Sequence, residues 1–410
     1  MPKAIVGLDV GSSTIKAVIA ELKKDGKISI SRVFKFDSGG IRRGMVDDVA
    51  ATTRAISVAI SEIKQHNKDA VKNIYLAIGS PNVRTQPSEG LVAVSRADLE
   101  ICKDDIARAK EMAESVNKIP PNRNIIHSLT EEFVVDDIAD IRDPLGMTGT
   151  RLKAKSLLVD AFMPAINTLT RCVETAGGSI SGLIFNPLAG GRSVLSKNQK
   201  DLGVMVVDIG FGTTSFAFYQ DNRLLHTGSF PAGAGHITND LAIGLKIAIS
   251  AAENIKFSFG SALAKEVPLR ETVELTKFDD STRGNASRRF ISEIIESRLA
   301  EIFEFIHNEL RRFGVAGRLP AGVILTGGGA KLHGVADLVR QELRLPARVG
   351  TPDMSYFHID SAEDGAMVDD PEYACVLGLV LWGADKSLDS SLAGAHGSGW
   401  FRKFLNYFMP

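Results

Sequence analysis

The chain has 410 residues, of which 44% are hydrophobic and 24% are charged, and its formal net charge at pH 7 is −1. This size predicts two to four domains with sizeable cores, and the near-neutral charge argues against a general nucleic-acid-binding surface. The three cysteines, Cys102, Cys172 and Cys375, show neither metal-ligand spacing nor a pairing pattern, so the sequence predicts no zinc site and no disulfide framework.

The first chemical motif is AIVGLDVGSSTIKAVIAEL at residues 4–22. It predicts a strand that ends near Asp9, a tight Gly-Ser turn and a second strand. A glycine turn lets the backbone approach an anion closely, and its successive N–H groups form an anion-binding nest. The residues that can contact a phosphate here are Gly11, Ser12, Ser13 and Lys16.

The next stretches predict a turn, a helix and then a small module. Residues 38–66 read as a Gly-rich turn followed by a helix. Residues 85–164 form an α+β module with its own pattern: a strand in EGLVAVS (89–95), an amphipathic helix over 97–116, and two strands in 124–138 and 151–163.

The second motif, LGVMVVDIGFGTTSFAFYQ at residues 202–220, repeats the pattern of the first. A strand reaches Asp208, a glycine turn follows, and small hydroxyl residues lead into another strand; the turn residues are Gly210, Gly212, Thr213 and Thr214. Two copies about 200 residues apart indicate two related halves. Either motif alone also fits a plain β-hairpin, but Asp9 and Asp208 together favour phosphate binding, since they can hold a hydrated Mg²⁺.

The third motif is AGVILTGGGAKLHGVADLVRQEL at residues 321–343. A strand leads into three adjacent glycines, Gly327, Gly328 and Gly329, and a helix follows. This arrangement permits close contact with a flat or anionic ligand. The spacing matches neither a Walker A loop nor a dinucleotide-binding fingerprint.

These three motifs, in this order, resemble the actin-like ATPase superfamily. The resemblance implies an α/β fold of two domains with a nucleotide cleft between them, binding ATP and Mg²⁺. Residues 9–16 and 208–215 would be the phosphate loops, and 326–334, with Lys331, would be the adenosine loop. Glu253 and Lys256 would border the ribose and base, although an ordinary exposed helical ion pair fits the same spacing. Residues 185–195 and 369–383 resemble the two connecting helices.

Within this superfamily the chain resembles the FtsA family of bacterial cell-division proteins. The supporting stretches are GIRRGMVDD (40–48), LAIGSPNVRT (76–85), NPLAGG (186–191), AENIK (252–256) and an aromatic carboxyl terminus. The implied subdomains are IA (1–84 with 165–198 and 360–383), IC (85–164), IIA (199–239 with 316–359) and IIB (240–315). In this family the small module IC replaces the usual actin subdomain.

The carboxyl-terminal segment has the composition of a tether followed by an anchor. Residues 384–398 are small and polar and predict a flexible linker. Residues 399–410 predict an amphipathic membrane-targeting helix, whose membrane-contacting residues are Trp400, Phe401, Arg402, Lys403, Phe404, Leu405 and Phe408. A helix docked on the protein itself, or on a partner, is the alternative.

The resemblance also implies partners. The carboxyl-terminal peptide of the tubulin-like division protein FtsZ would contact Arg298 and Glu301, where an intrahelical ion pair is the alternative. Ser297 stands where the family often has proline. The other implied partners are further copies of the chain, anionic lipid and downstream division proteins.

The implied function is an ATP-binding, filament-forming protein at the division septum. It would tether the FtsZ ring to the cytoplasmic face of the inner membrane. No catalytic residue is assigned; Asn186 could orient a water, because relatives often have Glu at its position, so hydrolysis is expected to be slow or absent. The alternatives are a PilM-like pilus-assembly adaptor and a metabolic kinase, which would need a catalytic Asp that the sequence does not reveal.

Overall fold

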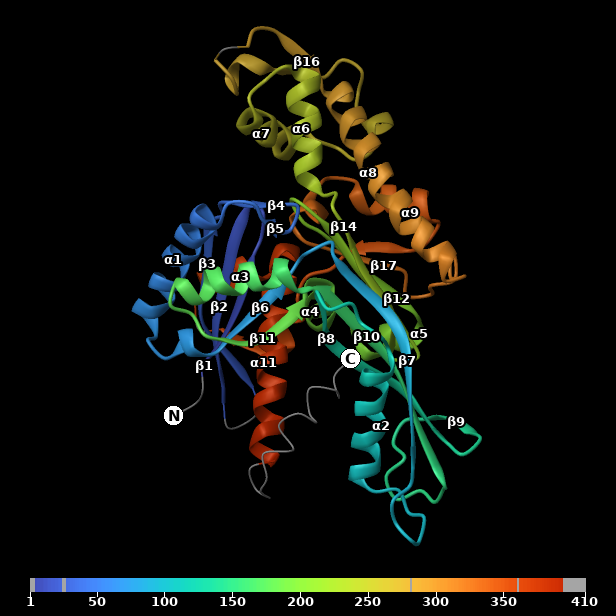
Figure 1. Cartoon of the computed structure of the whole chain (residues 1–410). Helices are drawn as coiled ribbons and strands as arrows, with labels where there is room; N and C mark the ends of the chain where they lie inside the picture. The colour runs from blue at the N-terminus through green and yellow to red at the C-terminus, as the bar shows by residue number, and fades with distance from the viewer. Residues whose placement is uncertain (1–3, 24–26, 281, 360, 394–410) are drawn as a thin grey trace.

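The computed structural model describes residues 4–23, 27–280, 282–359 and 361–393. Two α/β halves lie side by side, with a smaller helical group at one end of the molecule and a small module of strands and one helix at the other end (Figure 1). The predicted membrane helix at 399–410, with all its membrane-contacting residues, lies outside the described residues, as does the 394–398 part of the predicted linker. No helix in the described ranges combines the length and apolar character needed to span a bilayer.

The first half is built on a six-stranded sheet in the order β11-β6-β1-β2-β3-β19. Strands β1, β2 and β3 form an antiparallel meander, while β6 and β11 continue from β1 in parallel. The strands are β1 (Ala4–Val10), β2 (Thr14–Leu22), β3 (Ile28–Asp37), β6 (Ile74–Ile78), β11 (Ile180–Phe185) and β19 (Phe357–Ile359). The predicted range 316–359 assigned β19 to the other half, but β19 pairs with β3 and forms an edge of this sheet.

Helices cover both faces of this sheet, which is why β1 is apolar at almost every position. Val6 and Leu8 of β1 pack towards α1 (Val49–His66) and α3 (Met163–Thr175). Ile5 packs in the core that contains α4 (Asn186–Val194) and α11 (Ala374–Ala393). The Gly-rich segment before α1 forms a small hairpin, β4 (Ile41–Arg42) and β5 (Met45–Val46), and α10 (Ala362–Val368) follows β19.

The second half repeats this connectivity in a five-stranded sheet, β14-β13-β12-β17-β18. Strands β12, β13 and β14 form an antiparallel meander, and β17 joins β12 in parallel as β6 joins β1. The elements are α5 (Lys197–Leu202), β12 (Val204–Ile209), β13 (Thr214–Gln220), β14 (Arg223–Phe230), β17 (Val323–Thr326), η4 (Gly328–Lys331), α9 (Val335–Leu343) and β18 (Ala347–Val349). The predicted relation between the two halves is confirmed by this shared topology.

The inserted module has a four-stranded sheet, β7-β10-β8-β9, with α2 packed against β7 and β10. Its elements are β7 (Val83–Ala93), α2 (Lys103–Val116), β8 (Arg123–Val135), β9 (Ile138–Ile141) and β10 (Arg151–Phe162). The predicted α+β character is confirmed, but the helix begins at Lys103, six residues later than predicted. Asp105 accepts hydrogen bonds from the Ser95 and Cys102 N–H groups, which fixes the helix start, and Leu99 has a φ of 58° that a helix excludes.

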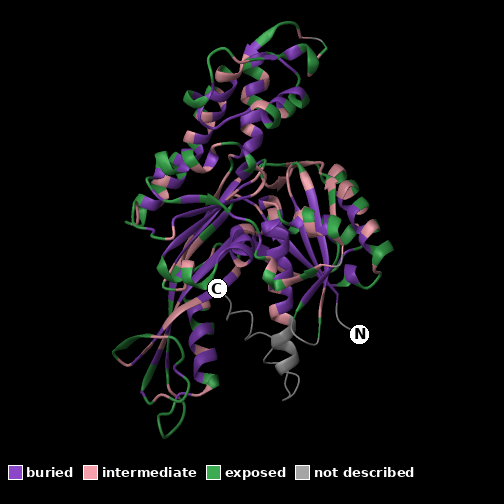
Figure 2. Cartoon of the chain, turned by 180° about the vertical axis from the view of Figure 1, so that it is seen from behind, coloured by how far each residue is buried: buried purple, intermediate pink, exposed green. Residues whose placement is uncertain are grey.

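A helical group stands on the second half, at the top of Figure 1. It contains α6 (Ala234–Leu245), α7 (Ile249–Phe259), the short strands β15 (Thr272–Glu274) and β16 (Asn285–Ser287), and α8 (Arg288–Arg312). The predicted boundary between residues 239 and 240 falls inside α6. In Figure 2 the buried residues run through both sheets and along the inner faces of these helices.

The long helix α11 corrects the predicted linker. It continues without interruption to Ala393, so the prediction of a flexible linker is wrong for residues 384–393. Two contacts hold the extension: Asp385 accepts a hydrogen bond from Arg192 of α4 at 3.1 Å, and the Lys386 ammonium donates to the Ser181 carbonyl at 3.2 Å. No glycine or proline interrupts the chain between residues 384 and 393, so nothing local ends the helix before Gly394.

Candidate functional site

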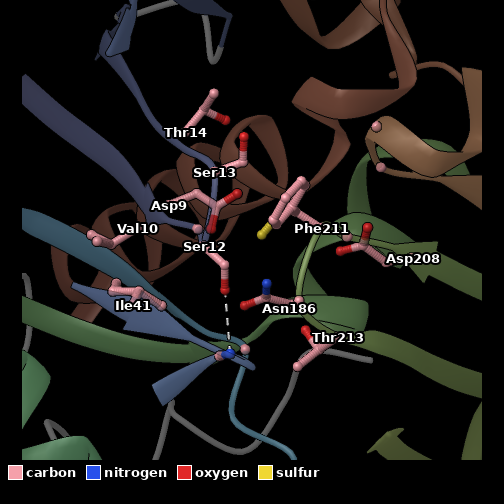
Figure 3. Close-up of a pocket in the computed structure, with 18 of the residues that line it drawn as sticks. Asp9, Val10, Ser12, Ser13, Thr14, Ile41, Asn186, Asp208, Phe211 and Thr213 are labelled. Carbon is pink, nitrogen blue, oxygen red and sulfur yellow. Dashed lines mark hydrogen bonds between the residues drawn. The ribbon is translucent and has the colours of Figure 1, made fainter. Parts of the chain in front are cut away.

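The three predicted loops meet in one cavity of about 320 Å³ between the two halves. Most of the predicted nucleotide-binding residues line it: Asp9, Gly11, Ser12, Ser13, Lys16, Asp208, Gly210, Gly212, Thr213, Glu253, Lys256, Gly327, Gly328 and Gly329. Figure 3 shows Asp9 and Asp208 on strands of opposite halves, with Asn186 between the two phosphate loops. Two predicted residues, Thr214 and Lys331, do not line the cavity.

The two phosphate loops have the same closing hydrogen bond. The Gly11 N–H donates to the Thr14 carbonyl at 3.0 Å, and the Gly210 N–H donates to the Thr213 carbonyl at 2.9 Å. Each bond makes a tight turn just after the strand that carries the aspartate. The sequence repeat is therefore also a repeat of local geometry.

The two phosphate loops come close together at Gly212. A Cβ atom on Gly212 would lie 2.6 Å from the Ser12 Oγ atom and 3.1 Å from the backbone nitrogen of Arg43. The Ser12 hydroxyl accepts a hydrogen bond from the Gly44 N–H in the β4–β5 hairpin at 3.4 Å, drawn as the dashed line in Figure 3. The hairpin thus closes one side of the cavity.

The aspartate pair is electrostatically strained. Burial, together with the nearby Asp9 carboxylate, raises the pKa of Asp208 to about 7, while Lys16 opposes the shift. Burial also raises the pKa of Asp9, with Lys16 lowering it and Glu372 adding to the rise. Two carboxylates short of positive charge fit a Mg²⁺ ion, which binds through one or two carboxylates and keeps several waters.

The third loop packs directly on Asp208. Gly327 has a φ of 82°, and a Cβ atom there would lie 2.2 Å from the Asp208 Oδ1 atom, so only glycine fits. Nothing lies within 4 Å of the corresponding position at Gly328, which leaves room for a ligand. Lys331 does not line the cavity itself; it forms an ion pair with Asp370 and lies 3.6 Å from the cavity-lining Glu372.

Lys256 and Glu253 are not an exposed surface pair. Lys256 is only 2% exposed, and its ammonium donates to Glu253 at 2.7 Å and to the Thr238 hydroxyl at 2.9 Å. Burial lowers the pKa of Lys256, and Glu253 opposes the shift. The burial of Lys256 rules out an ordinary exposed ion pair, and both residues line the cavity.

Two other predicted residues have different positions. Thr214 is the first residue of β13 and is fully buried, and it does not line the cavity, so a phosphate contact by its hydroxyl stays a prediction. Asn186 is the first residue of α4 and lines the cavity, and its Oδ1 atom is buried without a hydrogen-bond partner among the described residues. An acceptor left in this state is available to a water or ligand.

The predicted partner residues lie on α8 and do not line the cavity. The Arg298 guanidinium makes two hydrogen bonds to Asp240 of α6, at 2.6 and 3.0 Å, and one to Glu301 at 2.6 Å. The intrahelical ion pair is therefore present. A peptide contact at these residues stays a prediction.

The sequence patterns did not single out several residues that line the cavity, among them Lys35, Gly44, Phe211 and Glu372. Lys35 alternates with apolar residues in β3, and Glu372 lies in the η6 turn (Pro371–Tyr373) just before an apolar helix. Both are charged residues next to buried segments, and this is the sequence pattern that could have marked them as site residues. Their mutual contact could not be predicted, since 336 residues separate them in the chain.

Comparison with known proteins assigns the chain to a family. A family model described as "Cell division protein FtsA" matches residues 205–378, and one described as "SHS2 domain inserted in FTSA" matches residues 81–159. The Cell division protein FtsA of Pseudomonas aeruginosa is 33% identical over 97% of this chain and 93% of that protein. The Bacillus subtilis protein of the same name is 32% identical over 92% of this chain and 82% of its own length.

Solved structures show the same fold at low sequence identity. The PilM-PilN type IV pilus biogenesis complex contains a chain that is 19% identical, with a TM-score of 0.64 over 93% of this chain and 98% of its own. MreB5 of Spiroplasma citri, bound to ADP, is 12% identical, with a TM-score of 0.55 over 96% of this chain and 99% of its own. The predicted actin-like α/β fold of two domains is confirmed.

Proposed function

The chain belongs to the FtsA family of cell-division proteins, and from this we propose that it binds ATP with Mg²⁺ in the cleft between its halves. The observation that carries the proposal is the convergence of three glycine loops and two aspartates in one cavity. The two phosphate loops would hold the phosphates, and Asp9 and Asp208 would hold the hydrated metal. The loop at 326–334, with Glu253 and Lys256, would border the adenosine.

We propose that the protein hydrolyses ATP slowly or not at all. A bound metal would neutralise charge on the phosphates. ATP hydrolysis also needs a residue that positions the attacking water. Asn186 has an unpartnered oxygen at the cavity and can orient a water, but an amide cannot remove its proton. Nucleotide binding would therefore control assembly of the protein, without a need for the energy of hydrolysis.

The four groups of elements in the fold correspond, in this proposal, to the subdomains of the family. The two sheets are IA and IIA, the β7–β10 module is IC, and the α6–α8 group is IIB. The protein would polymerise with further copies of itself and act with downstream division proteins. It would lie on the cytoplasmic face of the inner membrane at the septum.

We propose that the aromatic residues 399–410 bind anionic lipid weakly in one copy and strongly in an assembled array. Full-length protein, mixed with anionic vesicles and ATP, is expected to float with the lipid, while the chain ending at Ser398 stays at the bottom. If both chains float equally, or neither does, the tether proposal is wrong. A pilus-assembly adaptor is the alternative, and the fold likeness to the pilus complex supports it only weakly beside the FtsA relatives.

A second test addresses the FtsZ peptide at α8. Arg298→Ala and Glu301→Ala are each expected to weaken binding of an FtsZ carboxyl-terminal peptide about tenfold, measured by fluorescence anisotropy, because each removes a charge-assisted contact. Arg312→Ala is the matched control, since Arg312 pairs with Glu309 three residues away on the same helix. If the wild type and the three variants bind the peptide with equal affinity, Arg298 and Glu301 have a structural role only.

A further inference from the structure

Glu372 lines the cavity and lies within 4 Å of three lysine ammonium groups. Its side chain is 12% exposed. The Oε1 atom accepts a hydrogen bond from Lys35 at 2.7 Å and lies 3.6 Å from the Lys331 ammonium. The other oxygen, Oε2, faces Lys16 at 3.9 Å. The carboxylate is thus held firmly on one side and only loosely engages the lysine of the first phosphate loop.

The surrounding strands fix this geometry. Asp9, Lys16 and Lys35 are direct partners on β1, β2 and β3, so they form one row across the sheet. Residues directly opposite each other on neighbouring strands point to the same face. The row therefore presents one carboxylate and two ammonium groups to the cavity.

The turn that carries Glu372 is attached to both halves. In the second half, Lys331 pairs with Asp370, and the Gly327 N–H donates to the Pro371 carbonyl at 2.9 Å. In the first half, Lys35 holds Glu372 itself. The carboxylate has therefore little freedom to move away when an anionic ligand enters.

Building on the proposed nucleotide site, we propose that Glu372 is a resident counter-anion that competes with the ligand's phosphates for Lys16. Lys35 and Lys331 act as positioning residues, because they hold the Oε1 atom and prevent a full ion pair between Glu372 and Lys16. The affinity for polyphosphate is then set by a balance among these side chains. Lys16 turns to the ligand, and Glu372 stays with Lys35.

This arrangement predicts effects of opposite sign. Glu372→Gln keeps the shape of the side chain and removes the competing charge, so ADP with Mg²⁺ is expected to bind about fivefold more tightly, the size of a screened charge pair. Lys35→Gln releases Glu372 towards Lys16 and is expected to weaken ADP binding by a similar factor. A purely structural role for Glu372 predicts weaker binding for both variants.

The test is a double-mutant cycle on full-length protein, using titration with fluorescent ADP and Mg²⁺. If Lys35 acts through Glu372, the effect of Lys35→Gln falls to less than half in the Glu372→Gln background. If Lys35 touches the ligand directly, the effect is the same in both backgrounds and the inference is overturned. Lys277→Gln and Glu274→Gln, at an exposed ion pair of the helical group, are matched controls for charge removal.

The outcomes separate this inference from the proposed function. If the wild-type protein binds neither ATP nor ADP, the nucleotide proposal itself fails. If the wild type binds and Glu372→Gln binds equally or more weakly while its thermal unfolding is unchanged, only the counter-anion inference fails. AMP is expected to respond less than ADP to both substitutions, because it carries fewer phosphates into the lysine row.

Discussion

Asp208→Asn is expected to abolish Mg²⁺-dependent nucleotide binding and, at the same time, to make the ligand-free protein more stable. The first effect follows from the proposed metal site, which has only two carboxylates and loses one. The second follows from the raised pKa of about 7, which shows that the folded cavity disfavours the charged form of Asp208. Asparagine keeps the shape of the side chain without the charge.

The stability of the ligand-free protein is expected to depend on pH through Asp208. The folded protein holds a proton on Asp208 up to about pH 7, whereas an unfolded Asp titrates near the ordinary pKa of 3.8. The stability from this proton is fully present below about pH 4 and is lost as pH rises through about 7. Ionised Asp208 therefore costs the ligand-free fold on the order of 2–4 kcal/mol at pH 8.

The measurement is thermal unfolding at pH 5 and pH 8, with and without ATP and Mg²⁺. Asp208→Asn is expected to unfold at a higher temperature than the wild type at pH 8, with a smaller difference at pH 5, and to gain nothing from nucleotide. Asp137→Asn is the control, since that side chain is 97% exposed. A variant that still gains stability from nucleotide would contradict the site.

Among the substitutions proposed here, Gly378→Ala is expected to lower the free energy of unfolding the most. Gly378 lies where α11 crosses α4, and a Cβ atom there would lie 1.8 Å from the Ala189 carbonyl oxygen. The new Cβ atom is fixed to the backbone of α11 and would clash with the backbone of α4, so neither group can rotate away. The two helices would have to separate, at a cost of about 3 kcal/mol or more. Because domains are stable by only about 5–15 kcal/mol, the melting temperature should fall steeply.

A matched substitution is available in the short helix α10. Gly365 has no heavy atom within 4 Å of its Cβ position, so Gly365→Ala is expected to be neutral or to stabilise the protein by about 0.5–1 kcal/mol through helix propensity. Denaturant unfolding of the two variants, read against the wild type, makes the comparison. Equal shifts would show that α11 and α4 are not tightly packed.

The sequence predicted those parts of the site that are encoded locally. Asp9 and Asp208 each stand beside a glycine turn within a dozen residues of chain, so pattern alone placed them correctly at the cavity. Glu372 could not be predicted, because its partners Lys35 and Lys16 come from strands more than 300 residues away. Only the fold brings these charges together.

The errors in secondary structure have the same cause. Residues 384–393 look like a linker by composition but continue α11, and contacts of Asp385 and Lys386 with distant residues hold the first part of this stretch. Residues 97–102 carry helical periodicity, but Asp105 uses its carboxylate to fix the start of α2 after them. In both places a tertiary or capping interaction outweighs local propensity.

The length of α11 also sets how far the proposed anchor can reach. With the helix extending to Ala393, only five residues precede position 399, and these can span at most about 17 Å. A linker of fifteen residues would have allowed about 50 Å. Bound to a membrane, the body would therefore stand close above the lipid on the end of α11. In Figure 1 the α6–α8 group lies at the opposite end of the molecule, where it would face the cell interior.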